Sequence, residues 1–244
     1  MGRLFGTDGA RGVANTELTC EQAMAIGRAA AMVLIETKHG RPRVVIGKDT
    51  RASSDMLEAA LAAGFCSVGA DVELLGVVPT PAVAYLVSLY KADAGVMISA
   101  SHNPCEYNGI KIFNGEGYKL SDALEEEIEA IVLDGAQTPP TPVGGDVGRI
   151  SRCDKAVDDY VRHVAAVTDV NLRGMKIAVD CANGSASATA RRLFSLLGAD
   201  CVFLNDQPDG VNINENCGST HIEVLREYVK ENHLDVGFAF DGDA

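Results

Sequence analysis

The stretch that decides the fold reads Ala94-Gly95-Val96-Met97-Ile98-Ser99-Ala100-Ser101-His102-Asn103-Pro104. Its first five residues are apolar and carry no helix-capping signal, so they predict a short buried strand. Pro104 prevents a helix from continuing at once, which leaves Ser101 on a tight loop at the carboxyl end of that strand. Because open α/β sheets bind their ligands at this edge, the stretch predicts an α/β fold with a functional serine.

The same serine has a plainer interpretation as part of a polar turn, because asparagine is favoured before proline in such turns. His102 follows Ser101 directly, so the two side chains diverge and a protease-type serine–histidine pair is not expected. On spacing alone the turn is the stronger interpretation. Evidence for chemistry has to come from other parts of the chain.

Strand and helix patterns alternate along the chain, which is typical of helices packed on a largely parallel sheet. Strands are expected over residues 44–46, 72–78, 94–98, 109–113, 176–180, 201–204 and 236–240, with 109–113 antiparallel or at an edge. Helices are expected from a Thr19–Gln22 capping box to Gly40, from Ser53 or Ser54, after Pro79-Thr80-Pro81, from Ser121, near Lys155, from Ser185 or Ser187, and from a Thr220–Glu223 box. Residues 135–148 lose the pattern and are rich in glycine, proline and threonine. We therefore expect two domains, 1–150 and 151–244, as rough copies of one α/β unit.

Composition indicates an ordinary globular protein, since 47% of the 244 residues are hydrophobic and 23% are charged. The net charge of −13 is spread over both halves and leaves no basic face, which argues against nucleic-acid binding. Seven cysteines without a C-x-x-C pair argue against a zinc site and a disulfide framework. With no recognisable leader and no apolar run of membrane-spanning length, we expect a cytoplasmic protein without a membrane partner.

Two segments carry groups that suit a phosphate. The loop from Gly6 to Gly12 combines backbone-permissive glycines with Thr7 and Arg11, so it is able to wrap an anion. Lys48 and Arg51 directly follow a predicted strand and should point from the carboxyl edge of the sheet. Taken alone, the first segment is better explained as a glycine-rich turn with a surface arginine, and a solvated charge cluster is the default explanation of the second.

Two further features suggest chemistry near Ser101. Asp241-Gly242-Asp243 follows an apolar strand, and two carboxylates at this spacing suit Mg²⁺, although an Asp-Gly hairpin turn is the competing interpretation. Lys111 is a general acid or base if burial lowers its pKa, and otherwise an exposed strand lysine.

Together these segments resemble the α-D-phosphohexomutase superfamily, and the resemblance covers the whole chain. Residues 99–104 match its phosphoserine signature, and 241–243 match the start of its magnesium loop. The opening Phe5–Gly12, the run Asn212-Ile213-Asn214 and residues 217–221 are similar to the branch that acts on glucosamine phosphates.

The resemblance implies four domains, of which this chain holds the first two, each a three-layer α/β/α unit with a mixed, mostly parallel sheet. It implies a phosphorylated Ser101, with Mg²⁺ held by Ser101, Asp241 and Asp243. Arg11 and Lys111 are implied to orient the reacting hydroxyl and move its proton, with His102 as a further catalytic candidate. The candidates for binding phosphate are Thr7, Arg11, Lys48, Arg51 and Asn103.

The resemblance further implies a small phosphosugar substrate and glucosamine 1,6-bisphosphate or glucose 1,6-bisphosphate as activator, and it allows a homodimer. The third and fourth domains would hold the sugar-selecting loop and the substrate's phosphate, so we expect this chain alone to be inactive. Three alternatives stay open: a superfamily member acting on mannose or glucose phosphates, a metal-dependent phosphatase with a serine nucleophile, and a structural or binding fragment without turnover.

Overall fold

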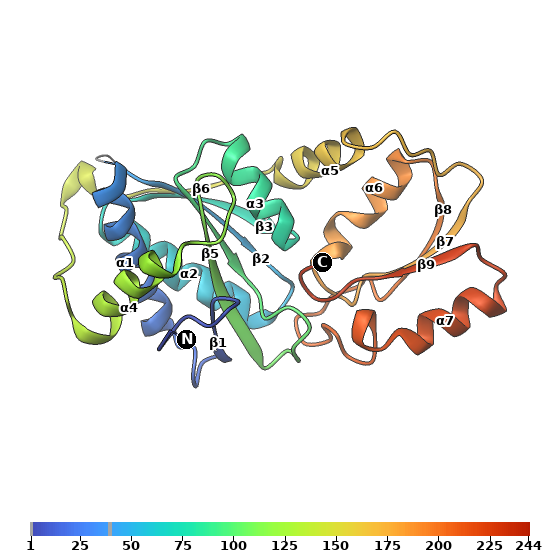
Figure 1. Cartoon of the computed structure of the whole chain (residues 1–244), viewed down its shortest axis with the longest axis horizontal. Helices are drawn as coiled ribbons and strands as arrows, with labels where there is room; N and C mark the ends of the chain where they lie inside the picture. The colour runs from blue at the N-terminus through green and yellow to red at the C-terminus, as the bar shows by residue number, and fades with distance from the viewer. Residues whose placement is uncertain (1, 39–40) are drawn as a thin grey trace.

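The protein forms two lobes joined by a central region, as shown by a computed structural model that describes residues 2–38 and 41–244 (Figure 1). The first lobe is built on a six-stranded sheet of order β1-β5-β4-β2-β3-β6. Its strands are β1 (Ala10–Val13), β2 (Arg43–Lys48), β3 (Asp71–Val77), β4 (Ala94–Ile98), β5 (Tyr107–Asn114) and β6 (Ile150–Arg152). Five strands run in one direction, and β5 runs antiparallel to its two neighbours, β1 and β4. The predicted mixed, mostly parallel sheet is confirmed.

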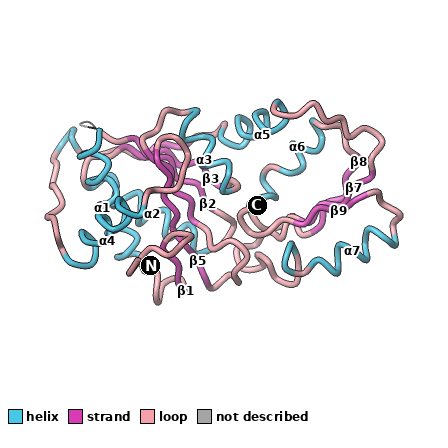
Figure 2. The backbone as a smooth tube through the Cα atoms, viewed as in Figure 1, coloured by secondary structure: helices cyan, strands magenta, loops and turns pink. Residues whose placement is uncertain are grey.

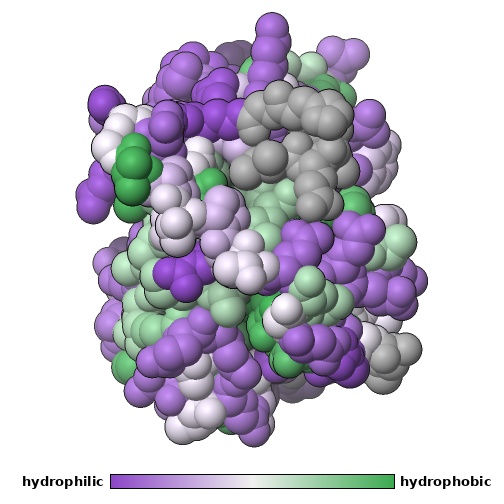
Figure 3. Space-filling view, turned by 90° about the vertical axis from the view of Figure 1, so that its left-hand side faces the viewer, coloured by the Kyte–Doolittle hydropathy of each residue, from purple (hydrophilic) through white to green (hydrophobic). Residues whose placement is uncertain are grey.

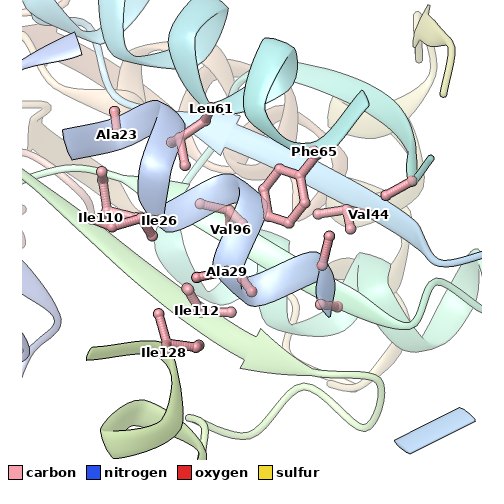
Figure 4. Close-up of a cluster of buried hydrophobic side chains, with 14 of the residues drawn as sticks. Ala23, Ile26, Ala29, Val44, Leu61, Phe65, Val96, Ile110, Ile112 and Ile128 are labelled. Atoms are coloured by element: carbon pink, nitrogen blue, oxygen red, sulfur yellow. The ribbon is translucent and has the colours of Figure 1, made fainter. Parts of the chain in front are cut away.

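Helices cover both faces of this sheet. Val44 and Ile46 of β2 pack in one apolar cluster with α1 (Cys20–Lys38), α2 (Ala52–Ser67) and α4 (Asp122–Asp134). Val45, between them, belongs to a second cluster with α3 (Thr80–Leu89) and the start of α5 (Ala156–Ala166). Successive strand residues point to opposite faces, so this alternation gives the expected α/β/α layers. Figure 4 shows the first cluster, in which Phe65 and Leu61 face strand residues such as Val96.

The second lobe holds a three-stranded parallel sheet of order β8-β7-β9. Its strands are β7 (Lys176–Asp180), β8 (Asp200–Leu204) and β9 (Val236–Ala239), and its helices are α6 (Ala190–Leu196) and α7 (Ile222–Glu231). The two helices lie on opposite sides of the sheet, and the tube view shows the same layering with the carboxyl terminus between the lobes (Figures 1 and 2). The domain boundary at residue 150 stays a prediction; β6, which spans it, pairs with β3 of the first sheet.

The first predicted helix start is confirmed. Thr19 Oγ1 accepts from the Gln22 N–H at 3.3 Å, and Gln22 Oε1 accepts from the Thr19 N–H at 3.1 Å. The stop assigned to Gly40 lies outside the described residues. Ser121 also caps as expected, since its hydroxyl accepts from the Leu124 N–H at 3.4 Å.

Three predicted caps are wrong. Helix α2 begins at Ala52, and Ser54 instead donates to the Asp49 carboxylate at 2.9 Å. Residues 185–188 form a 3₁₀ turn before α6, in which Ser187 donates to the Gly184 carbonyl. Thr220 ends another 3₁₀ turn, and α7 starts without a side-chain cap. Short polar side chains serve several local hydrogen-bond patterns, so a hydroxyl before an apolar run does not identify the helix start.

The cysteines, the helices and the face shown in Figure 3 have the features of an ordinary globular protein. All seven cysteines have free thiols. Within residues 2–38 and 41–244, none of the helices combines the length and apolar character needed to cross a bilayer. The end of the first lobe that faces away from the second shows hydrophilic and hydrophobic residues interspersed, as on most globular surfaces (Figure 3).

A buried glutamate on α4 ties down the amino-terminal segment. Glu129 is 3% exposed, and its carboxylate accepts from three backbone N–H groups, those of Arg3 at 3.0 Å and of Leu4 and Phe5 at 2.7 Å. Burial acts to raise the pKa of Glu129, but these hydrogen bonds and the Arg3 charge outweigh it and hold the pKa below its usual value.

We predict that Glu129→Gln destabilises the chain by about 1–3 kcal/mol at neutral pH, because an amide satisfies fewer of these donors. The control is Glu127→Gln, because Glu127 is exposed on the same helix. A depressed pKa stabilises the fold above the unfolded value of about 4.3, so the difference from wild type should shrink as pH falls below it. Urea unfolding at several pH values measures this, and equal stability of the two variants at pH 7 would refute it.

Candidate active site

Two loops from opposite lobes meet between the sheets. The serine loop, residues 99–104, follows β4, and the Asp-Gly-Asp loop, residues 241–243, follows β9 close to the carboxyl terminus marked in Figure 1. Ser101 Oγ donates to Asp241 Oδ2 at 2.6 Å, although 140 positions separate the two residues. Both loops leave the carboxyl ends of parallel strands, so each sheet presents its functional edge to the other.

Asp243 gathers cationic and hydroxyl donors from the first lobe. Its carboxylate accepts from Lys111 Nζ at 2.9 Å and from the Thr80 hydroxyl, and its backbone carbonyl accepts from the Thr80 N–H at 2.9 Å. Burial acts to raise the pKa of Asp243, but the Lys111 charge and the hydrogen bonds outweigh it, so the pKa is lowered. The carboxylate is therefore ionised at neutral pH.

Gly242 allows the two loops to touch. A Cβ at this position would lie 2.5 Å from the Ser101 carbonyl oxygen, 2.8 Å from Ile213 Cδ1 and 3.0 Å from Asn214 Nδ2. No larger residue fits without moving one loop, so the glycine between the two carboxylates is a packing requirement.

The serine loop is strained and held from several sides. Ser101 has a φ of 55°, in the left-handed region that costs a residue other than glycine about 1–3 kcal/mol. The Ser99 hydroxyl accepts from the Ser101 N–H at 3.0 Å. The carbonyls of Ser101 and Asn103 accept from Arg51 Nη2 at 3.2 and 2.6 Å, and from Asn214 Nδ2 at 2.9 and 3.0 Å.

Two predicted phosphate ligands are engaged elsewhere in this structure. The Arg51 side chain is fully buried, forms an ion pair with Asp49 and holds the serine loop. Lys48 is held by Asp55 at 2.7 Å and Glu58 at 2.6 Å, and among the described residues its ammonium has no hydrogen bond or ion pair with either loop. Both predictions assumed that charges at a strand end face solvent, whereas carboxylates close in sequence capture these two.

Arg11 and Thr7 lie nearer to the two loops. Arg11 of β1 pairs in register with Gly109 of β5, where a Cβ would lie 3.0 Å from Arg11 Cγ and 2.6 Å from the Ser99 carbonyl oxygen. The Arg11 guanidinium reaches Asp8 at 3.1 Å, and its Nε is buried without a partner within residues 2–38 and 41–244. Thr7 is exposed and lines a cavity of about 210 Å³ together with Thr80 and Lys111.

His102 and Asn103 have different surroundings. His102 is exposed and lines a separate cavity of about 460 Å³, whose far wall includes Ile213 and His221 of the second lobe. No hydrogen bond among the described residues links its ring to Ser101. Asn103 contributes its backbone carbonyl to the contacts with Arg51 and Asn214.

The donor set is compatible with a hard cation. Ser101 Oγ and the carboxylates of Asp241 and Asp243 are all oxygen donors, which Mg²⁺ prefers. Across the part of the chain that the structure describes, no group of three or more His, Cys, Asp and Glu side chains is placed to hold a metal. Mg²⁺ commonly binds one or two carboxylates together with phosphate oxygens, so these residues fit the ion if a phosphate supplies further ligands.

Sequence reasoning missed several residues that shape this region. Thr80 was assigned only to a turn, and Asn214 only to a polar loop similar to one branch of a family. Thr80 follows β3 at the same sheet edge as Ser101, a signal that could have placed it near the site. Asp49, which pairs with Arg51 in the buried network, carried no signal of its own.

Comparisons with known proteins agree with this fold. Residues 2–139 match the family model described as phosphoglucomutase/phosphomannomutase, alpha/beta/alpha domain I, and residues 158–244 match domain II of the same family. Proteins named phosphoglucosamine mutase from Clostridium novyi (strain NT) and Acetivibrio thermocellus are each 58% identical over the whole chain. The chain spans about half the length of these curated relatives, 54% in each case. A crystal structure of a phosphoglucomutase/phosphomannomutase family protein from Burkholderia thailandensis matches with a TM-score of 0.82 and 30% identity, covering 98% of this chain and 52% of that one.

We predict that Gly242→Ala separates the two loops, because its Cβ would overlap the Ser101 carbonyl oxygen. Overpacking of this kind costs about 1–3 kcal/mol and should speed hydrogen exchange of the amides in residues 99–103. Gly145→Ala, at a position with open space around it, should change stability by less than about 0.5 kcal/mol. Urea unfolding and exchange mass spectrometry measure both, and unchanged protection of the serine loop in Gly242→Ala would rule out the packing requirement.

Proposed function

This chain belongs to the phosphoglucomutase/phosphomannomutase family, and we propose that it supplies the serine-bearing half of a phosphoglucosamine mutase. The whole enzyme would be an isomerase that interconverts glucosamine 6-phosphate and glucosamine 1-phosphate through a phosphoserine and a 1,6-bisphosphate. The 1-phosphate would serve UDP-N-acetylglucosamine and cell-wall precursor synthesis. A cytoplasmic location and a homodimer belong to the same proposal.

One observation carries the proposal. The hydroxyl of Ser101, at the carboxyl edge of one sheet, donates at 2.6 Å to Asp241 from the other lobe, with the Lys111–Asp243 ion pair beside it. A protease serine needs a histidine that accepts its proton, and among the described residues no histidine accepts from the Ser101 hydroxyl. The Ser101 hydroxyl is therefore poorly placed to act as a protease nucleophile. It is well placed to carry a phosphoryl group next to a cation, since phosphoryl transfer depends mainly on positioning and charge.

In the proposed first half-reaction, the phosphoryl group on Ser101 passes to O1 of glucosamine 6-phosphate. The bond from phosphorus to Ser101 Oγ breaks as the bond to O1 forms, and the O1 proton passes to a basic group. Lys111, acting as the neutral amine, is the candidate acceptor of this proton, since its Nζ lies 2.9 Å from Asp243 in the same cluster as Ser101. Arg11 is the candidate for orienting the sugar hydroxyl, because its buried Nε still has a free donor among the described residues.

In the second half-reaction the bisphosphate reorients and returns its 6-phosphate to Ser101, which releases glucosamine 1-phosphate. Asp241 and Asp243 would hold Mg²⁺ together with the phosphate on Ser101. When bound, Mg²⁺ would neutralise the charge that builds up on the phosphoryl oxygens. Glucosamine 1,6-bisphosphate or glucose 1,6-bisphosphate would serve as activator by phosphorylating Ser101. Thr7, which lines the cavity beside Lys111, remains a proposed phosphate contact.

We predict that Ser101→Ala in the complete enzyme abolishes both incorporation of phosphate from the bisphosphate and mutase turnover. Ser195→Ala, an exposed serine on α6, is the control and should leave both unchanged. A coupled assay for glucosamine 1-phosphate and mass spectrometry of the phosphorylated chain report the two effects. Mutase activity retained by Ser101→Ala would exclude the phosphoserine mechanism.

Removal of divalent cations with EDTA should abolish turnover of the complete enzyme, and added Mg²⁺ should restore it, because two carboxylates beside the phosphoserine need a counter-charge.

The same turnover assay separates the alternative functions. A mutase forms the isomeric sugar phosphate without stoichiometric inorganic phosphate, whereas a serine phosphatase releases it. Faster turnover of mannose or glucose phosphates than of glucosamine phosphates would assign the enzyme to another branch, and turnover by the 244-residue chain alone would overturn the expectation that it is inactive.

A further inference from the structure

We propose that Asn214 is a positioning residue for Ser101, holding the backbone of the serine loop from the opposite lobe so that Ser101 Oγ faces the Asp-Gly-Asp loop. This inference rests on the proposed function, because it concerns the geometry from which phosphate is transferred. Asn214 lies in the polar run 212–220 of the second lobe.

The contact joins one side chain to two carbonyls of the serine loop. Asn214 Nδ2 donates to the Ser101 oxygen at 2.9 Å and to the Asn103 oxygen at 3.0 Å. Arg51 Nη2 donates to the same two oxygens at 3.2 and 2.6 Å. The loop is therefore clamped by one donor from its own lobe and one from the other lobe.

Asn214 is itself held in place. It is 7% exposed and has a φ of 59°, a left-handed conformation that asparagine tolerates better than most residues. Its backbone N–H donates to the Ala182 carbonyl at 2.9 Å. The Cβ that Gly242 lacks would lie 3.0 Å from Asn214 Nδ2, so the amide is confined between the two loops.

The two clamps are not equivalent. Arg51 pairs with Asp49, and both residues belong to the first lobe, so Arg51 fixes the serine loop only relative to the sheet of that lobe. Asn214 belongs to the lobe that carries Asp241 and Asp243, so it sets the serine backbone relative to both carboxylates. Ser101 sits at a φ of 55°, and a rotation of that backbone would redirect Oγ away from Asp241. Misplacement of a reacting atom by about 1 Å can lower a rate on the order of 100-fold.

The test compares Asn214→Gly with Asn216→Gly in the complete enzyme. Asn216 is an exposed asparagine of the same loop with a φ of 53°, so glycine relieves the same backbone conformation in both variants, and only Asn214 loses a side-chain contact with the serine loop. The measurements are kcat, KM for glucosamine 6-phosphate, the thermal midpoint, and the single-turnover rate of phosphate transfer from glucose 1,6-bisphosphate to Ser101.

For Asn214→Gly we expect kcat and the single-turnover rate to fall together by roughly 10-fold to 100-fold, with KM and the thermal midpoint close to those of wild type. Asn216→Gly should match wild type in all four measurements. Transfer rates of Asn214→Gly within about twofold of wild type would overturn the inference, and so would an equal loss in both variants.

If Asn214→Gly unfolds, two other measurements keep the inference testable. Asn214→Asp preserves shape but places a carboxylate against two carbonyls, so it should lose transfer rate at least as strongly while Asn216→Asp does not. Hydrogen exchange of residues 99–105 should speed up in either Asn214 variant, and unchanged exchange with an unchanged transfer rate would overturn the inference. Failure of wild type to phosphorylate Ser101 would instead contradict the proposed function.

Discussion

The structure depends on one close approach, that of the Gly242 backbone to the carbonyl oxygen of Ser101. A single Cβ on Gly242 would lie 2.5 Å from that oxygen, so the contact exists only because glycine occupies the position. It brings the carboxyl edges of two parallel sheets together, and with them a hydroxyl from one lobe and two carboxylates from the other. Neither lobe holds this combination by itself.

The polar groups around this contact fall into two sets, one fully buried and one a partly exposed ion pair. Arg51, Asp49 and Ser99 are buried and form hydrogen bonds with one another and with the serine loop, although Arg51 Nε has no partner among the described residues. Lys111 and Asp243 form a partly buried ion pair that stays near the surface between the lobes. The charges of the first group hold a strained backbone, and those of the second are the ones to which we assign roles in the proposed reaction.

Much of the fold was predictable because it depends on local patterns. Three such patterns are confirmed by the structure, and each depends only on residues close in sequence: the apolar run 94–98, the Thr19–Gln22 box and the alternation in 109–113. Local motifs and a resemblance to a family also singled out Ser101, Asp241 and Lys111, which the structure brings close together; their roles stay predictions. The burial of Arg51 could not be predicted, because it depends on Asp49 and on a loop some 50 positions away. The partners of Asn214 could not be predicted, because Ser101 and Asn103 lie 113 and 111 positions away and no sequence pattern connects them to it.

The central claim is that Ser101 carries the phosphoryl group between the two lobes. The most direct measurement is peptide mapping by mass spectrometry of the complete enzyme after incubation with glucose 1,6-bisphosphate and Mg²⁺, before and after addition of glucosamine 6-phosphate. We predict one phosphate per chain on the peptide containing Ser101, lost when the sugar monophosphate is added. Phosphate on a different residue, or phosphate on Ser101 that the sugar cannot remove, would contradict it.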